Sequence, residues 1–108
     1  MKQDLIKKLD NDAVLCAEGY LFELERRGYL QAGAFVPQVV LEYPEVVIQL
    51  HNEFIRCGTD VVMALTYYAH REKLKVVGRE DALESMNREA LRIARNLADE
   101  HNLFMAGN

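Results

Sequence analysis

Hydrophobic residues recur along the chain with two different periods, and these periods predict alternating helices and strands. Spacings of three and four residues predict helices over Gln3–Asp10, Tyr20–Arg27, Pro44–Cys57 and, longest, from about Glu80 to Glu100. Short unbroken apolar runs predict buried strands over Ala13–Ala17, Val61–Leu65 and Leu103–Ala106. Strands that alternate with helices are typical of an α/β fold with a parallel sheet.

The two longest predicted helices each carry one apolar stripe that would cover a sheet. The stripe of the first consists of Tyr43, Val47, Leu50, Phe54 and Cys57. The stripe of the second consists of Leu83, Met86, Ala90, Ile93 and Leu97, and charged residues on its opposite face indicate a solvated surface. Gly28 and Gly58 follow helical patterns, where a left-handed residue ends a helix. The stretch Arg71–Arg79 is basic and mixed, and no element is predicted for it.

The spacing of the strands predicts the architecture. Each strand begins about 40 or more residues after the previous one, which is longer than the roughly 30 residues of a plain barrel unit. A parallel sheet of three strands would leave two apolar edges unpaired. We therefore expect residues 1–108 to be a single partial domain, the N-terminal portion of a (β/α)8 TIM barrel with about two and a half βα units.

Composition and charge exclude several classes of partner. Half of the residues are hydrophobic, 28% are charged, and the net charge is −4. An acidic chain without a basic cluster argues against nucleic acid or an anionic membrane as its partner. The N-terminus lacks the apolar core of a signal peptide, and no run is long enough for a membrane helix. Cys16 and Cys57 are interpreted as free, buried thiols of a cytoplasmic protein.

Polar and aromatic side chains come directly after the second predicted strand. In α/β folds, ligands bind beyond the carboxyl ends of parallel strands, so Thr66–His70 is the best candidate for a site. We expect the strand to end at Thr66, which would free both Tyr67 and Tyr68 for the mouth. In the alternative interpretation, the two tyrosines only cover the core and keep their hydroxyl groups in water.

Glu18 and Gly19 follow the first predicted strand in the same way. Glu18 could orient a cationic substrate or transfer a proton, or its carboxylate could cap the start of the next helix. Among the histidines, His51 is interpreted as a surface residue, and His70 as a solvated loop residue that lies closer to the candidate site. No phosphate loop, His-Glu-x-x-His or Cys-x-x-Cys motif is present, and Cys16 and Cys57 are not expected to share a metal.

These stretches resemble the opening third of the betaine–homocysteine S-methyltransferases, within the homocysteine-binding methyltransferase family. The matching segments, in unchanged order, are Glu18–Gly33, Tyr43–Val47, Leu50–Asp60, Leu65–Ala69 and Lys73-Leu74. The resemblance implies a zinc enzyme on a (β/α)8 barrel, one that transfers a methyl group from betaine or a similar onium donor to homocysteine. Zinc in this family binds the thiol and lowers its pKa.

The resemblance also implies which residues bind substrate. Tyr67 and Tyr68 match the aromatic residues around the cation of the donor, and Phe35 stands where the family has a tryptophan. Ala17-Glu18-Gly19 stands where the family has Asp-Gly-Gly, which leaves open whether Glu18 replaces the missing aspartate. The zinc cysteines of the family lie in later strands, so this segment would hold no catalytic residue and no metal and would be inactive alone. The full-length protein would be a homo-oligomer.

A second interpretation belongs to a different class of protein. The chain could be a non-catalytic α/β module that completes its sheet with a partner chain, since open strand edges pair readily. A reading frame that continues into strands with a Gly-Gly-Cys-Cys-type segment would favour the methyltransferase.

Overall fold

The computed structural model describes residues 4–29 and 38–107. Its elements are α1 (Leu5–Asn11), α2 (Tyr20–Arg26), α3 (Val39–Glu42), α4 (Pro44–Arg56), β1 (Val61–Met63), α5 (Arg71–Val76), the 3-10 turn η2 (Glu80–Ala82), α6 (Leu83–Glu100) and β2 (Phe104–Ala106). The four predicted helices are confirmed, with ends that differ by a few residues. The short helices α3 and α5 were not predicted.

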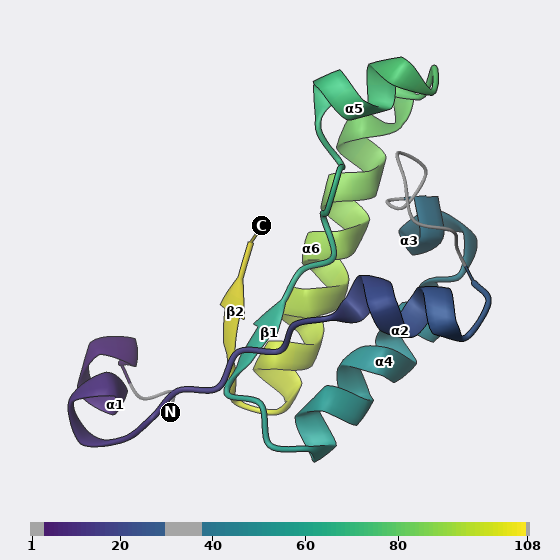
Figure 1. Ribbon diagram of the computed structural model, residues 1–108. Coiled ribbons are helices and arrows are strands. Elements are labelled where there is room, and N and C mark those ends of the chain that lie inside the picture. The colour runs from purple at the N-terminus through teal and green to yellow at the C-terminus, as the bar shows by residue number, and fades with distance from the viewer. Residues whose placement is uncertain (1–3, 30–37, 108) are drawn as a thin grey trace.

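The strands form a small parallel sheet with β1 in its middle. Val61, Val62 and Met63 pair with Phe104, Met105 and Ala106. On the other side of β1, Cys16 forms an isolated parallel bridge with Val61. Three parallel segments therefore lie side by side, with α6 packed against β1 and β2 and α4 packed against α6 (Figure 1). This mixed α/β arrangement with parallel strands agrees with the predicted fold class.

The first predicted strand, Ala13–Ala17, is wrong as a regular strand. Leu15 is 59% exposed, and only the bridge at Cys16 joins this segment to β1. The N–H group of Leu15 donates to the carboxylate of Asp60 at 2.8 Å. This N–H group therefore does not form a backbone hydrogen bond of a regular β-ladder. Asp60 also pairs with Lys8 at 2.9 Å. These contacts, chiefly the Leu15 N–H, hold the pKa of the Asp60 carboxyl below its usual value.

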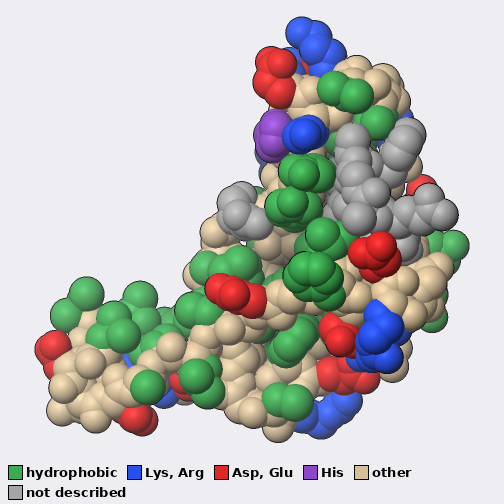
Figure 2. All heavy atoms as spheres, in the orientation of Figure 1, with side chains coloured by type: hydrophobic (Ala, Val, Ile, Leu, Met, Phe, Trp, Pro, Cys, Tyr) green, Lys and Arg blue, Asp and Glu red, His purple; other side chains and the backbone are tan. Residues whose placement is uncertain are grey.

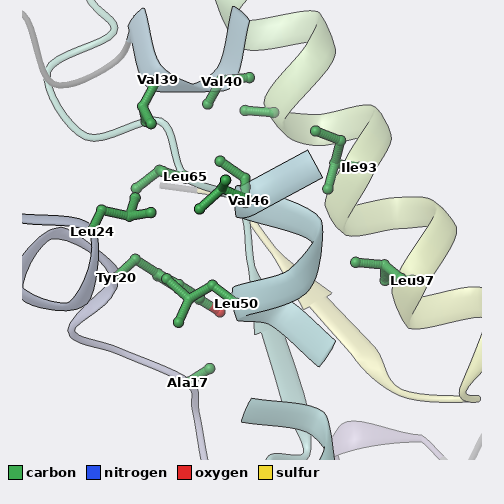
Figure 3. Packing of buried hydrophobic residues seen from close by; sticks show 12 residues of the cluster. Ala17, Tyr20, Leu24, Val39, Val40, Val46, Leu50, Leu65, Ile93 and Leu97 are labelled. Carbon is green, nitrogen blue, oxygen red and sulfur yellow. The ribbon is translucent and has the colours of Figure 1, made fainter. Parts of the chain in front are cut away.

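The core lies between the helices and one face of this sheet. Leu24 of α2, Leu50 of α4 and Ile93 of α6 are almost completely buried and belong to one hydrophobic cluster (Figure 3). The predicted stripe of α6 is confirmed: Met86, Ala90, Ile93 and Leu97 are buried and Leu83 is half-buried. Its opposite face carries the ion pairs Arg88–Glu84, Arg92–Glu89 and Arg95–Asp99. Such exposed pairs each add a few tenths of a kcal/mol, about 0.2–0.5.

The predicted stripe of α4 is correct in its middle and wrong at its ends. Val47 and Leu50 are buried, whereas Tyr43 and Cys57 are exposed. Both exposed residues flank the helix as its N-cap and C-cap residues, outside the part that packs on the core. Gly58 follows with a φ of 102°, which confirms the expected left-handed helix stop.

Helix α1 stands apart from the rest of the molecule at the end of an extended segment (Figure 1). None of its residues is buried, and Leu5, Ile6 and Leu9 expose 40%, 66% and 53% of their surface. Figure 2 shows hydrophobic side chains gathered on the lobe that α1 forms. Among the described residues, no helix combines the length and the hydrophobicity needed to cross a bilayer.

Candidate functional site

The two candidate tyrosines lie in a turn beyond the carboxyl end of β1. The last strand residue is Met63, so the strand ends ahead of both tyrosines, as expected, although three residues before Thr66. The N–H group of Ala69 donates to the carbonyl of Thr66 at 3.0 Å and closes the turn. Tyr68 has a φ of 65°, in the left-handed region that a residue with a side chain rarely adopts.

Glu18 and Gly19 lie at the carboxyl end of the neighbouring segment, directly before α2. Gly19 is the N-cap residue of α2 with a φ of 80°, and this helix has no side-chain cap. Among the described residues, Glu18 therefore forms no capping hydrogen bond with α2. The Glu18 side chain is exposed and has no hydrogen bond or ion pair with any other residue that the structure describes.

Side chains from these two segments line one hollow of about 310 Å³. The lining consists of Glu18, Gly19, Tyr20, Leu21, Phe22, Met63 and Tyr67. It therefore contains one carboxylate, three aromatic rings and a thioether, and no cationic side chain. A carboxylate beside aromatic faces attracts a cation, because the negative charge and the ring quadrupoles act in the same direction.

Tyr20 connects the wall of this hollow to the sheet. Its ring is buried, and its hydroxyl oxygen accepts the N–H group of Met63 at 3.4 Å. Burial raises the pKa of Tyr20 to about 12, so the phenol stays neutral at physiological pH. Neither Tyr20 nor Met63 was predicted to be a site residue, although Tyr20 directly follows Gly19. Phe22 is 74% exposed and also lines the hollow.

Tyr68 lies behind Tyr67 and does not line the hollow. The two rings stack with their centroids 4.1 Å apart and an interplanar angle of 21°. A hydrogen bond with the Tyr68 hydroxyl is the main reason that the pKa of Tyr67 is raised. The ammonium of Lys73 lies 4.6 Å from the centroid of the Tyr68 ring. Of the five predicted binding residues, Glu18, Gly19 and Tyr67 thus share one hollow, Tyr68 supports it, and Phe35 lies outside the described residues.

Two predictions about burial are wrong. Cys16 and Cys57 are free, as expected, but both are exposed, because the segment around Cys16 has an open edge and Cys57 lies beyond the last turn of α4. His51 is 1% exposed, and neither ring nitrogen has a hydrogen-bond partner among the described residues. Its ring meets Tyr20 edge-on, with centroids 4.8 Å apart. Burial lowers the pKa of His51 to about 4.

The described residues do not fit a zinc site. They contain no group of three or more His, Cys, Asp or Glu side chains close enough to hold a metal ion. Cys16, Glu18 and Cys57 line one hollow of about 360 Å³, but they do not form such a group.

The largest of the three hollows described here, about 430 Å³, lies between α2 and α4. Its charged walls neutralise each other, because Arg27 pairs with Glu23 at 3.1 Å and with Glu53 at 2.8 Å. Arg56 also lines this hollow and has no ion pair among the described residues, so its charge would repel a cation. For a cation, this hollow is therefore a weaker candidate than the one beside Glu18.

Known proteins resemble this chain over nearly all of its length. A family model described as homocysteine S-methyltransferase matches residues 15–108. Betaine–homocysteine S-methyltransferase 1 of Bos taurus is 37% identical over 112 residues, which cover 99% of this chain and 28% of that protein. The protein of the same name from Sus scrofa is also 37% identical, over 98% of this chain and 40% of its own length.

A solved structure supports the fold. The homocysteine methyltransferase MmuM from Escherichia coli, in its metallated form, superposes with a TM-score of 0.76 at 23% identity. The match covers 95% of this chain and 40% of that one. The chain thus spans well under half the length of these relatives. From the family match over residues 15–108 and the two relatives, we conclude that the chain belongs to the homocysteine S-methyltransferase family.

Proposed function

We propose that the protein containing this chain transfers a methyl group from betaine or a similar onium donor to the sulfur of homocysteine, giving methionine. Residues 1–108 would form the front part of its (β/α)8 barrel and the donor side of its substrate mouth. Family membership supports the reaction class. The observation that carries the donor assignment is the hollow in which Glu18 and the ring of Tyr67 lie together without a cationic side chain. The comparisons do not favour a non-catalytic module.

The chemistry of the transfer explains why a cation site is useful. The homocysteine sulfur, which has lost its proton and reacts as a thiolate, forms a bond to the methyl carbon as the bond from that carbon to the onium nitrogen or sulfur breaks. The donor loses its positive charge in this step and leaves as a neutral amine or sulfide. Glu18 and Tyr67 would therefore hold the donor more strongly than the demethylated product, which favours release of the product.

The zinc expected from the family finds no ligand set among the described residues. We therefore assign no step of the reaction to zinc in this chain, and we propose that the complete protein takes its zinc ligands from elsewhere. This chain alone should then be inactive. We further propose that the complete protein is a cytoplasmic homo-oligomer that acts on small molecules and binds neither nucleic acid nor membranes.

The test is a methyl-transfer assay of the complete protein with homocysteine and, in turn, betaine, a sulfonium compound and a methylated amino acid. Tyr67→Ala should raise the KM of the preferred donor by about 2- to 30-fold, since a cation–aromatic contact contributes roughly 0.5–2 kcal/mol. The KM of homocysteine should change little.

Tyr43→Ala is the matched control. Tyr43 is 39% exposed and Tyr67 is 38% exposed, but Tyr43 contacts Tyr29 and does not line the hollow. An equal rise in both KM values for Tyr67→Ala would contradict the donor assignment. Absence of methyl transfer from every donor would contradict the proposed reaction.

A further inference from the structure

The hollow beside Glu18 is bounded by a stack of three groups. Tyr67 lines the hollow, the Tyr68 ring lies 4.1 Å behind the Tyr67 ring, and the ammonium of Lys73 lies 4.6 Å from the Tyr68 centroid. Rings that stack at 4.1 Å leave no space for an ammonium group between them. Lys73 must therefore lie on the face of Tyr68 that Tyr67 does not cover. The order is hollow, Tyr67, Tyr68, Lys73.

Lys73 is held in this position by the helix that carries it. The next residue of α5, Leu74, is completely buried in a cluster with Ala82 and Met86. The Lys73 side chain is half-buried and forms no ion pair within the part of the chain that the structure describes. The Tyr68 ring is thus the contact that engages its charge.

Tyr68 needs such a contact, because its backbone is strained. A residue with a side chain at a φ of 65° costs about 1–2 kcal/mol relative to an ordinary conformation. The contact of a cation with a partly exposed aromatic ring stabilises the folded protein by a similar free energy. Strained residues of this kind persist where their surroundings hold them, and they concentrate at binding sites.

We infer that Lys73 is a positioning residue for the donor site. Its ammonium holds the outer face of Tyr68, and Tyr68 in turn supports Tyr67 against the hollow. A bound onium ion therefore meets the face of Tyr67, whereas the free face of Tyr68 is already occupied by a cation of the protein. This inference rests on the proposed function for its ligand and on the stacked geometry for its mechanism.

The kinetic test compares three variants of the complete protein. Lys73→Met keeps the length of the side chain and removes its charge, so the donor KM should rise by about two- to fivefold. The homocysteine KM and the kcat at saturating donor should stay unchanged. Lys73→Arg keeps a cation over the ring and should restore the donor KM to within about twofold of the wild type. Lys75→Met removes an exposed charge from the same helix and should have no effect.

Two kinetic results would overturn the inference. One is an equal donor KM for Lys73→Met and Lys75→Met. The other is a Lys73→Arg protein that behaves like Lys73→Met, because a role that depends on the cation requires rescue by arginine.

A second measurement separates this inference from the proposed function. In NMR spectra, ring currents should shift the ε-methylene protons of Lys73 upfield, and Tyr68→Leu should abolish the shift. If the wild-type protein transferred no methyl group but showed this shift, the proposed reaction would fail while the contact of Lys73 with Tyr68 would stand. Unshifted Lys73 protons in the wild type would overturn the inference whatever the activity.

Discussion

Replacement of His51 by leucine should make the stability of the protein less sensitive to acid. His51 is buried without a hydrogen-bond partner among the described residues, and its pKa is lowered from 6.5 to about 4. The folded protein therefore keeps the imidazole neutral at a pH where the unfolded chain binds a proton. Leucine has a similar volume, needs no hydrogen bond and does not titrate.

The direction and size of the effect follow from these two pKa values. The contribution of a neutral His51 is fully present above pH 6.5 and is lost as the pH falls toward 4. Over the whole interval the loss is about 3 kcal/mol, and between pH 8 and pH 5 it is about 2 kcal/mol. The carboxyl groups with lowered pKa values, Glu23, Asp60 and Glu89, contribute losses at lower pH, equally in both proteins.

Urea unfolding of the complete protein at pH 8 and pH 5 measures this difference. The wild type should lose about 2 kcal/mol more than His51→Leu over this interval. His101→Leu is the control, since His101 is exposed in the turn after α6. Equal losses in the wild type and His51→Leu would show that His51 is not held neutral in the core, and the packing described for Tyr20 and His51 would be wrong.

Two further predictions concern stability and association. The 108-residue chain alone should be oligomeric or aggregated in analytical ultracentrifugation. The reason is that the segment around Cys16 and strand β2 have no sheet partner beyond β1 among the described residues, and open edges pair readily with other chains. A monomer with one sharp unfolding transition would contradict this prediction. Gly58→Ala should destabilise the complete protein by about 1–2 kcal/mol in urea unfolding. A Cβ at this position meets no atom within 4 Å, so the whole cost comes from the φ of 102°. Gly107→Ala is the control, because Gly107 has no positive φ.

The sequence predicted the elements whose signals are local. The stripe of α6 and the glycine stops at Gly28 and Gly58 depend on spacing and on backbone conformation, and the structure confirms them. The segment Ala13–Ala17 has the composition of a buried strand, but pairing depends on neighbours that are distant in sequence. Here Asp60 takes the Leu15 N–H group, and only one bridge forms.

The residue types of the candidate site could be predicted from the sequence, but the order in which Tyr67 and Tyr68 stack beside the hollow could not. Strand ends indicated that Glu18 and Tyr67 would be neighbours, and both line the same hollow. Adjacent tyrosines in a sequence do not show which ring faces a ligand, because the φ of Tyr68 and its stacking on Tyr67 decide this. The burial of His51 was missed because its helix position lies beside the predicted stripe, while the structure packs it against Tyr20.

The central claim is that the hollow beside Glu18 binds an onium cation. Calorimetric binding to the complete protein tests it with betaine and with 3,3-dimethylbutanoate, the isostere in which carbon replaces the charged nitrogen. We predict that betaine binds more tightly than the isostere. Glu18→Gln should weaken the binding of betaine by about fivefold, since opposite unit charges about 4 Å apart in water attract by about 1 kcal/mol. The affinity for the isostere should not fall, because it carries no positive charge for Glu18 to attract. Equal affinities for the two compounds, unaffected by Glu18→Gln, would contradict the claim.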